Sequence, residues 1–239
     1  MTFGERELTL LSASAILQDI APDVLLATLK NRPEDHFVLP PATTFVEAGQ
    51  VKPGLYLIAH GIIELFVIDA NDDSEKIVDF ARAGGTLAEE TLFSDRPLQY
   101  SARSLGQAAV LHLPDAVVSE WIASTPAFAR RLMSLVAERI NYLNKDMFTY
   151  RAKRATSRLV CYVLCHFNKA PMADDGSYSL LIEIPHNKLA SRLGVSASQV
   201  SRSFRELQDQ GLIVQQAQGY FIPNVPALSK YVCPGGCDF

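Results

Sequence analysis

A run of hydroxyl, amide and guanidinium side chains in the last quarter of the 239-residue chain has the types and spacing to contact nucleic acid. The run comprises Ser198, Gln199, Ser201, Arg202 and Arg205. On a helix, positions 198, 201, 202 and 205 recur at i, i+3, i+4 and i+7 and therefore share one face. An arginine can pair bidentately with guanine, and a serine hydroxyl reaches phosphates or base edges. We therefore predict that Arg202 and Ser201 contact bases of double-stranded DNA, with Arg205 on phosphate.

Two predicted helices position this face. The first spans residues 185–193, because a proline at its start has no amide hydrogen to leave unbonded. Gly194 then supplies the left-handed turn. The second helix begins after Ser196, which forms a capping box with Gln199, and it ends at Gly211. The apolar residues that face inward are Leu189, Leu193, Val200, Phe204 and Leu207. This pattern is typical of a helix-turn-helix with a recognition helix.

A predicted hairpin follows the second helix. Residues 212–216 and 219–223 flank Ala217-Gln218-Gly219 and indicate two short strands, or a wing. The alternative for the whole segment is an ordinary helical hairpin with a solvated polar face. The capping box, the turn glycine and the basic outer stripe together favour the DNA-binding interpretation.

The net charge of −4 conceals a division along the chain. Residues 1–150 carry 12 Lys and Arg against 20 Asp and Glu, a net −8. Residues 151–239 carry 10 against 6, a net +4, and the basic segment 151–158 forms the predicted hinge between the two parts. A basic C-terminal third beside an acidic remainder fits a nucleic-acid-binding domain attached to a domain of another kind.

The acidic part is rich in short β-type runs between residues 36 and 113. Glycines or turn residues separate the runs 37–39, 44–46, 55–59, 62–68, 76–80 and 110–113. We predict an antiparallel roll of jelly-roll type. The preceding segment 1–32 is predicted as a helical cap with a start at Pro22. Its amphipathic apolar positions are Leu17, Ile20, Val24, Leu25 and Leu29.

Residues 86–103 interrupt the strands and contain the acid pair Glu89 and Glu90 with arginines nearby. A short helix with paired acids inside a β-roll suggests a ligand-binding insert. A plain connecting helix is the alternative.

Residues 126–150 predict a long helix, because they contain no internal proline or glycine. At roughly 1.5 Å per residue, the helix would be about 37 Å long. Its apolar seam comprises Met133, Val136, Ile140, Leu143 and Met147. These steps of 3, 4, 3 and 4 are those of a coiled coil. We predict a homodimer, since a two-fold dimer places two recognition helices one DNA turn apart. Packing of the seam within one chain is the alternative.

The cysteines and histidines are the candidates for metal binding and catalysis. Cys161, Cys165, Cys233 and Cys237 form two Cys-x3-Cys pairs, a spacing compatible with metal ligation but not diagnostic. A four-thiolate site is possible if the tail folds back, while two buried helical thiols and a separate tail are the simpler interpretation. No nucleophile–base–acid set and no His-x-His pair occurs, so we expect no enzyme activity. No apolar run approaches the ~20 residues that span a bilayer, and no signal-peptide pattern is present. We therefore expect a cytoplasmic protein without membrane contact.

The order of these elements resembles the Crp/Fnr family of bacterial transcription regulators over nearly the whole chain. The resemblance rests on Tyr56-Leu57-Ile58-Ala59-His60-Gly61, on Ala88-Glu89-Glu90-Thr91-Leu92-Phe93, and above all on Leu193-Gly194-Val195-Ser196 with Val200-Ser201-Arg202. It implies an α+β fold. The expected parts are a cyclic-nucleotide-binding-like β-roll at 1–125, a dimerisation helix at 126–150, a winged helix-turn-helix at 151–226 and a tail at 227–239.

The resemblance also implies a mechanism. A small-molecule effector in the β-roll would shift the dimer between conformations that bind a palindromic operator poorly and well. RNA polymerase is the further partner that it implies. Two other functions stay open: a ligand-binding regulatory protein and a jelly-roll metalloprotein, both without DNA binding. The intact recognition helix argues against both.

Two departures from the family pattern change the expected specificity. Many members have Glu-Thr where this chain has Ser198 and Gln199, and that glutamate accepts from cytosine. Members that bind cyclic nucleotides carry a glycine and an arginine where Ala88 and Tyr100 stand, the arginine pairing with the cyclic phosphate. A buried phosphate without this arginine is poorly compensated, so we expect no tight cyclic-AMP binding. The implied effector pocket comprises Ala88, Glu89, Glu90, Leu92, Tyr100, Ser101 and Ala102.

Alternative phosphate ligands flank this pocket. Arg103 lies three residues past Tyr100, an odd offset that points it to the opposite face of a strand. The direction of Arg96, which precedes Pro97 in a turn, does not follow from the sequence.

The insert resembles most closely the nitric-oxide-responsive members of the dissimilatory nitrate respiration type, which implies haem as a possible cofactor. The candidate ligands are His36, His60 and His112, whereas His186 is expected on the surface at a helix start. Oxygen-sensing members hold an iron–sulfur cluster through N-terminal cysteines. The N-terminal part of this sequence has none, so we expect no such cluster.

Overall fold

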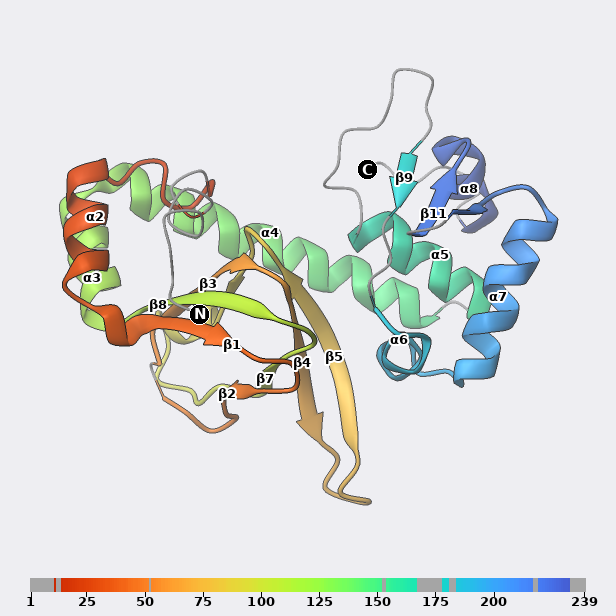
Figure 1. Ribbon diagram of the computed structural model, residues 1–239, viewed down its shortest axis with the longest axis horizontal. Helices are drawn as coiled ribbons and strands as arrows, with labels where there is room; N and C mark the ends of the chain where they lie inside the picture. Colours follow the sequence, from red (N-terminus) through yellow and green to blue (C-terminus); the bar gives the residue numbers. More distant parts are fainter. Residues whose placement is uncertain are drawn as a thin grey trace. The chain divides into compact units, whose positions relative to one another are not determined.

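The computed structural model describes residues 11, 14–51, 53–151, 154–166, 178–180, 184–216 and 219–232. The chain divides into two compact units, Met1–Glu138 and Arg139–Phe239. The long helix α4 (Pro126–Arg151) contributes to both (Figure 1). None of the described helices is long and apolar enough to cross a membrane.

The first unit contains two four-stranded antiparallel sheets, in the orders β1-β8-β3-β6 and β2-β7-β4-β5. The strands are β1 (His36–Leu39), β2 (Thr44–Val46), β3 (Leu55–His60), β4 (Ile62–Ile68), β5 (Glu75–Arg82), β6 (Thr86–Leu87), β7 (Ser101–Ser104) and β8 (Ala108–Leu113). The predicted roll is therefore confirmed. The β3–β4 turn requires Gly61 at φ +90°, because a Cβ there would stand 2.7 Å from the carbonyl oxygen of Gln107.

The predicted helical insert at 86–103 is wrong in part. Only the 3-10 turn η2 (Glu89–Thr91) is helical, and the strands β6 and β7 lie on either side of it. The sequence Ser-Ala-Arg-Ser of β7 has little β propensity, so no local pattern marked it as a strand. Pairing decides its conformation, because Ala102 lies opposite Leu65 of β4.

Two hydrophobic clusters fill this unit. One lies between the β1-β8-β3-β6 sheet and the helices α2 (Pro22–Lys30), α3 (Asp115–Ser124) and the start of α4. The other lies between the two sheets and includes Tyr56, Leu87 and Ala88. The N-terminal cap departs from the prediction, since Leu17 and Ile20 are buried in turns before α2. Val24 is 43% exposed, because α2 buries the stripe of Leu25 and Leu29 and leaves Val24 beside it.

The second unit has the predicted winged helix-turn-helix. Its elements are the end of α4, α5 (Ala155–His166), β9 (Tyr178–Leu180), α6 (His186–Leu193), α7 (Ala197–Asp209), β10 (Val214–Gln216), β11 (Gly219–Ile222) and α8 (Val225–Val232). The three strands form one antiparallel sheet in the order β10-β11-β9.

Two boundaries of this unit differ from the predicted ones. Helix α5 already starts at Ala155, within the predicted hinge, and Nη1 of Arg158 donates to the carbonyl oxygen of Leu193 at 3.2 Å. Helix α8 continues the unit beyond residue 226 and buries Leu228. The sequence lacked a signal for α8, because its apolar face is short and is defined by what it packs against. The rest of the predicted tail lies outside the described residues.

Candidate nucleic-acid interface and effector loop

Local hydrogen bonds fix the start of the recognition helix α7. The Ser196 hydroxyl accepts from the Gln199 amide at 3.2 Å, and the Gln199 side-chain oxygen accepts from the Ser196 amide at 2.8 Å. Gly194 takes φ +63° in the turn before it. These contacts confirm the predicted capping box and turn, which set the rotation of α7 about its axis.

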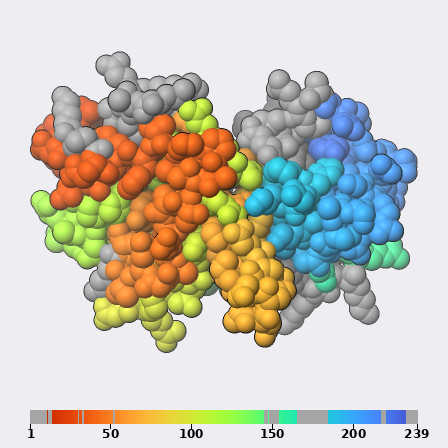
Figure 2. Space-filling view, turned by 60° about the horizontal axis from the view of Figure 1, so that its bottom comes forward, coloured from red at the N-terminus to blue at the C-terminus, as the bar shows by residue number. Residues whose placement is uncertain are grey.

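The exposed face of α7 carries the predicted polar and basic residues, with one correction. Ser198, Gln199, Arg202 and Arg205 are exposed, whereas Val200, Phe204 and Leu207 are buried. In Figure 2 the surfaces of α6 and α7, in cyan and blue, lie side by side. Ser201 is only half-buried at the edge of this face, and its hydroxyl lies 3.1 Å from Nδ1 of His186.

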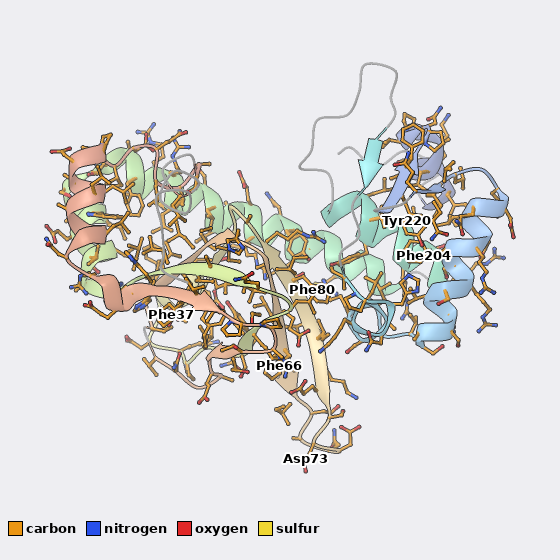
Figure 3. All side chains as sticks on the ribbon, in the orientation of Figure 1. Phe37, Phe66, Asp73, Phe80, Phe204 and Tyr220 are labelled. Carbon is orange, nitrogen blue, oxygen red and sulfur yellow. The ribbon has the colours of Figure 1, made fainter. Side chains whose placement is uncertain are left out.

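His186 begins α6 as predicted, but its side chain is half-buried. Its ring stacks on Phe204, with centroids 5.0 Å apart and planes 12° apart. Phe204 stacks in turn on Tyr220 of β11, at 4.6 Å and 10° (Figure 3). This stack joins α6, α7 and the wing. Sequence analysis missed it, because three aromatic rings spread over 35 positions carry no periodic signal.

A hydrogen-bond network anchors one flank of α7 through Glu206. The Thr156 hydroxyl donates to Glu206 Oε2 at 2.6 Å, and the Tyr231 hydroxyl donates to Glu206 Oε1 at 2.5 Å. The bond from Thr156, followed by that from Tyr231, lowers the pKa of Glu206. Burial and the bond to Glu206 raise the pKa of Tyr231. Helices α5, α7 and α8 are thereby tied together at one carboxylate.

The wing matches its prediction. Strands β10 and β11 pair antiparallel, with Val214 opposite Phe221 and Gln216 opposite Gly219. All three residues of β10 are exposed, including Val214 at 47%. The predicted turn residues Ala217 and Gln218 lie outside the described residues.

The effector loop closes on itself through two predicted pocket residues. The backbone amide of Ala88 donates to the Tyr100 hydroxyl at 3.0 Å. Ala88 is buried with φ +66°, a left-handed conformation that costs an alanine more than a glycine. The Tyr100 hydroxyl thus takes up the Ala88 amide, in the turn where the resemblance expects a bound phosphate.

The other predicted pocket residues are spread over different environments. Glu89 is buried at 5% exposure, whereas Glu90 is exposed. Leu92 packs on the first hydrophobic cluster, and the Ser101 hydroxyl accepts from the Ala48 amide at 3.0 Å. Ala102 is fully buried between the sheets. The structure therefore brings together Ala88, Tyr100 and Ala102 in the second cluster, and directs Leu92 and Glu90 elsewhere.

Arg103 does not replace the missing cation, because two carboxylates hold it. Arg103 Nε donates to Glu64 at 2.7 Å and its Nη1 donates to Glu75 at 3.0 Å, while its guanidinium lies 4.5 Å from the centre of the Phe66 ring. The hydrogen bond to Glu75, with that to Glu64, raises the pKa of Arg103. This is the opposite face predicted from the odd offset. Arg96 is exposed in the loop.

The three candidate haem histidines do not fit that role in this loop. His112 has Asp35 at 2.8 Å from Nδ1 and the Pro53 carbonyl oxygen beside Nε2, so both ring nitrogens are already engaged within the roll. His36 pairs with Leu111, and His60 with Ala109. Directly paired residues share a sheet face, so these two lie on the side of the first cluster, away from Tyr100.

Metal ligation finds no support among the residues that the structure describes. There, no group of three or more His, Cys, Asp or Glu side chains could hold an ion. Cys161 is half-buried on α5. The side chain of Cys165, and Cys233 and Cys237 altogether, lie outside the described residues, so the four-thiolate hypothesis stays a prediction.

The predicted seam of α4 is uncovered in the single chain. Met133 is 68% exposed, Ile140 55%, Leu143 48% and Met147 58%. Val136 is half-buried. Exposed large apolar side chains at coiled-coil spacing are characteristic of an interface.

Two family models match the chain. A cyclic nucleotide-binding domain matches residues 36–125, and a Crp-like helix-turn-helix domain matches residues 158–231. The HTH-type transcriptional regulator Cmr of Mycobacterium tuberculosis is 24% identical over 72% of this chain and 66% of that protein, slightly under two thirds of its length. The cAMP-activated global transcriptional regulator CRP of Pasteurella multocida is 22% identical over 73% of this chain and 83% of that protein.

Solved structures show the same fold. FixK2 of Bradyrhizobium japonicum superposes with a TM-score of 0.68 at 16% identity, over 81% of this chain and 94% of that one. A CooA variant of Carboxydothermus hydrogenoformans gives 0.63 at 14% identity, over 82% and 87%. At these identities the likeness shows the fold alone.

Proposed function

The chain belongs to the Crp/Fnr family of DNA-binding transcription regulators, and from this premise we propose that it acts as a homodimer on a palindromic operator. A small effector, sensed by the first unit and different from cyclic AMP, controls its affinity for that operator. RNA polymerase is the partner through which the bound dimer acts on transcription.

One observation carries this proposal: the rotation of α7. The capping box and the buried residues Val200, Phe204 and Leu207 direct Arg202 and Arg205 outward. In this geometry Arg202 has the reach and the paired donors to recognise a guanine, and Arg205 the charge to neutralise a phosphate. Ser198 and Gln199 stand where many members of the family have Glu-Thr, so the operator differs from the usual half-site at the base pair that this glutamate would read.

The exposed seam of α4 supports the homodimer. Burial of Met133, Ile140, Leu143 and Met147 against the same residues of a second copy would remove their side chains from water. A two-fold axis at this seam makes two recognition helices equivalent, as a palindromic operator requires.

The Ala88–Tyr100 hydrogen bond supports an effector other than a cyclic nucleotide. Some relatives are named as cAMP-activated, but their defining chemistry needs an arginine beside the phosphate, and the nearby Arg103 is held by two carboxylates. The loop resembles that of nitric-oxide-responsive regulators, yet the histidines do not fit a haem here. An effector bound through the polar groups of this loop is the proposal that remains.

The experiment combines selection and sedimentation. The full chain is incubated with a random duplex library, and bound sequences are selected at a stated salt concentration. An enriched palindrome with half-sites one helical turn apart, bound by a dimer in sedimentation, is the expected result. Failure to enrich any sequence, with and without cell-extract metabolites, would refute operator recognition.

A further inference from the structure

The contact between His186 and Ser201 bears on how the recognition helix selects a base. His186 is the first residue of α6, and its Nδ1 lies 3.1 Å from the Ser201 hydroxyl on α7. Ser201 stands next to Arg202 at the edge of the exposed face. The contact therefore crosses between the two helices at the surface that is proposed to meet DNA.

The imidazole has little freedom to turn away from Ser201. Its ring lies nearly parallel to Phe204, which is 3% exposed and lies nearly parallel to Tyr220. Such stacked rings attract one another and restrict rotation. The stack thus holds Nδ1 against the hydroxyl, which makes His186 part of a built arrangement and not an incidental neighbour.

A serine hydroxyl has one proton, so a fixed partner decides what it offers to a third group. If Nδ1 carries no proton, Ser201 must donate to His186 and presents only lone pairs outward. It then suits the amino group of cytosine or adenine. If Nδ1 carries the proton, Ser201 accepts from His186 and keeps its own proton for an acceptor on guanine or thymine.

We propose that His186 is a positioning residue for DNA specificity, which fixes the Ser201 hydroxyl and sets whether it acts as donor or acceptor toward one base pair. His186 acts through Ser201 and does not itself contact that base. The inference rests on the proposed operator recognition by α7. It adds to that function a determinant on the first helix of the motif.

The test measures base preference after the wild-type operator has been selected from a random duplex library. His186→Phe keeps a flat ring on Phe204 and removes the nitrogen. Ser201→Ala removes the hydroxyl. Both variants and the double variant should lose the same preference, about fivefold at one base position, as expected for one neutral hydrogen bond. Affinity for unrelated DNA should stay unchanged.

His186→Asn separates the hydrogen bond from the stack. Its side-chain amide reaches the place of Nδ1 but lacks the ring, so it should retain preference at that position while the melting temperature falls. A His186→Phe variant that keeps the wild-type preference would overturn the proposal. Loss of preference in His186→Asn as well as in His186→Phe would also overturn it, because a hydrogen-bonding group at the place of Nδ1 would then not be what sets the preference.

A spectroscopic readout checks the donor or acceptor role directly. The nitrogen chemical shifts of His186 in the full chain report whether Nδ1 is protonated. An unprotonated Nδ1 should accompany a preference for adenine or cytosine, and a protonated one a preference for guanine or thymine, on the strand facing Ser201. The opposite pairing would contradict the proposal. A wild type that enriches no sequence would instead refute the underlying operator recognition.

Discussion

The guanidinium of Arg192 donates to the phenolic oxygen of Tyr142 at 3.3 Å, although Arg192 is only 1% exposed. Arg192 also lies over the ring of Tyr162, at 5.6 Å from its centre. Tyr142 belongs to α4, Tyr162 to α5 and Arg192 to α6. A buried charge of this kind costs free energy unless it is hydrogen-bonded, so the contact fixes the helix-turn-helix to the end of the long helix.

Tyr142→Phe should destabilise the second unit by about 1–3 kcal/mol, because it removes an acceptor from a buried charged donor and leaves the ring in place. Denaturant unfolding of the full chain, followed by circular dichroism, measures this loss. Asn144→Ala changes an exposed residue of the same helix and serves as the control. An unfolding midpoint equal to that of the wild type would show that the contact contributes nothing.

Ile140→Glu should convert the proposed dimer into a monomer. The change places a carboxylate at the middle of the seam, where its burial would cost several kcal/mol. Sedimentation equilibrium measures the mass. Asn141→Glu introduces the same charge one position away, on an exposed residue outside the seam, and should leave the mass unchanged. If the Ile140→Glu protein remained a dimer, the seam would not be the dimer interface.

Arg202→Ala and Arg205→Ala should affect DNA binding in different ways. Loss of Arg202 should cost about 1–3 kcal/mol on the selected operator and relax the preference at one base position. Loss of Arg205 should weaken binding to all sequences alike. It should also lower the salt dependence of the affinity by an amount that corresponds to about one released counterion. Titrations at several salt concentrations distinguish the two. Equal effects of Arg202→Ala on operator and random DNA would mean that α7 docks in another way.

Cyclic AMP and cyclic GMP should bind weakly or not at all. The absence of a bidentate cation from a buried phosphate should cost upward of ~2 kcal/mol, which is more than about thirtyfold in affinity. Calorimetry with the wild type measures this directly. Micromolar binding would contradict the prediction, and its loss in Arg96→Ala would identify the exposed loop arginine as the phosphate ligand.

Stability of the second unit should fall at acid pH through Glu206. Its pKa is lowered in the folded state, first by Thr156 and then by Tyr231. A carboxyl whose pKa is lowered on folding contributes stability at pH values above its ordinary pKa of about 4.5. This contribution is lost as the pH falls through the pKa of the folded state. Glu206→Gln should flatten this part of the pH profile of the melting temperature. Asp209→Asn, exposed on the same helix, should not.

The sequence was sufficient wherever the signal is local. The capping box at Ser196 and Gln199, the turn at Gly194 and the buried stripe of α7 involve residues within a few positions of one another. Capping chemistry and helix periodicity, which act over a few residues, therefore determine them. The strands with strong β propensity and the α4 seam were predicted for the same reason.

Strand β7 and the network around Glu206 could not be predicted in this way. The residues of β7 adopt a strand because β4 and β2 pair with it, and Thr156 meets Glu206 across 50 positions of sequence. Neither relationship leaves a trace in composition or spacing, since both depend on how elements pack.

By itself, the sequence determined that a polar and basic helix face exists and that an apolar seam precedes it, because periodicity fixes which residues share a face. Only the tertiary structure decided what those residues touch. It placed His186 against Ser201, the Tyr100 hydroxyl on the Ala88 amide, and Arg103 between Glu64 and Glu75. A hydrogen bond requires two groups within about 3 Å in the right direction, and for residues far apart in sequence the crossing of helices and the register of strands set that geometry.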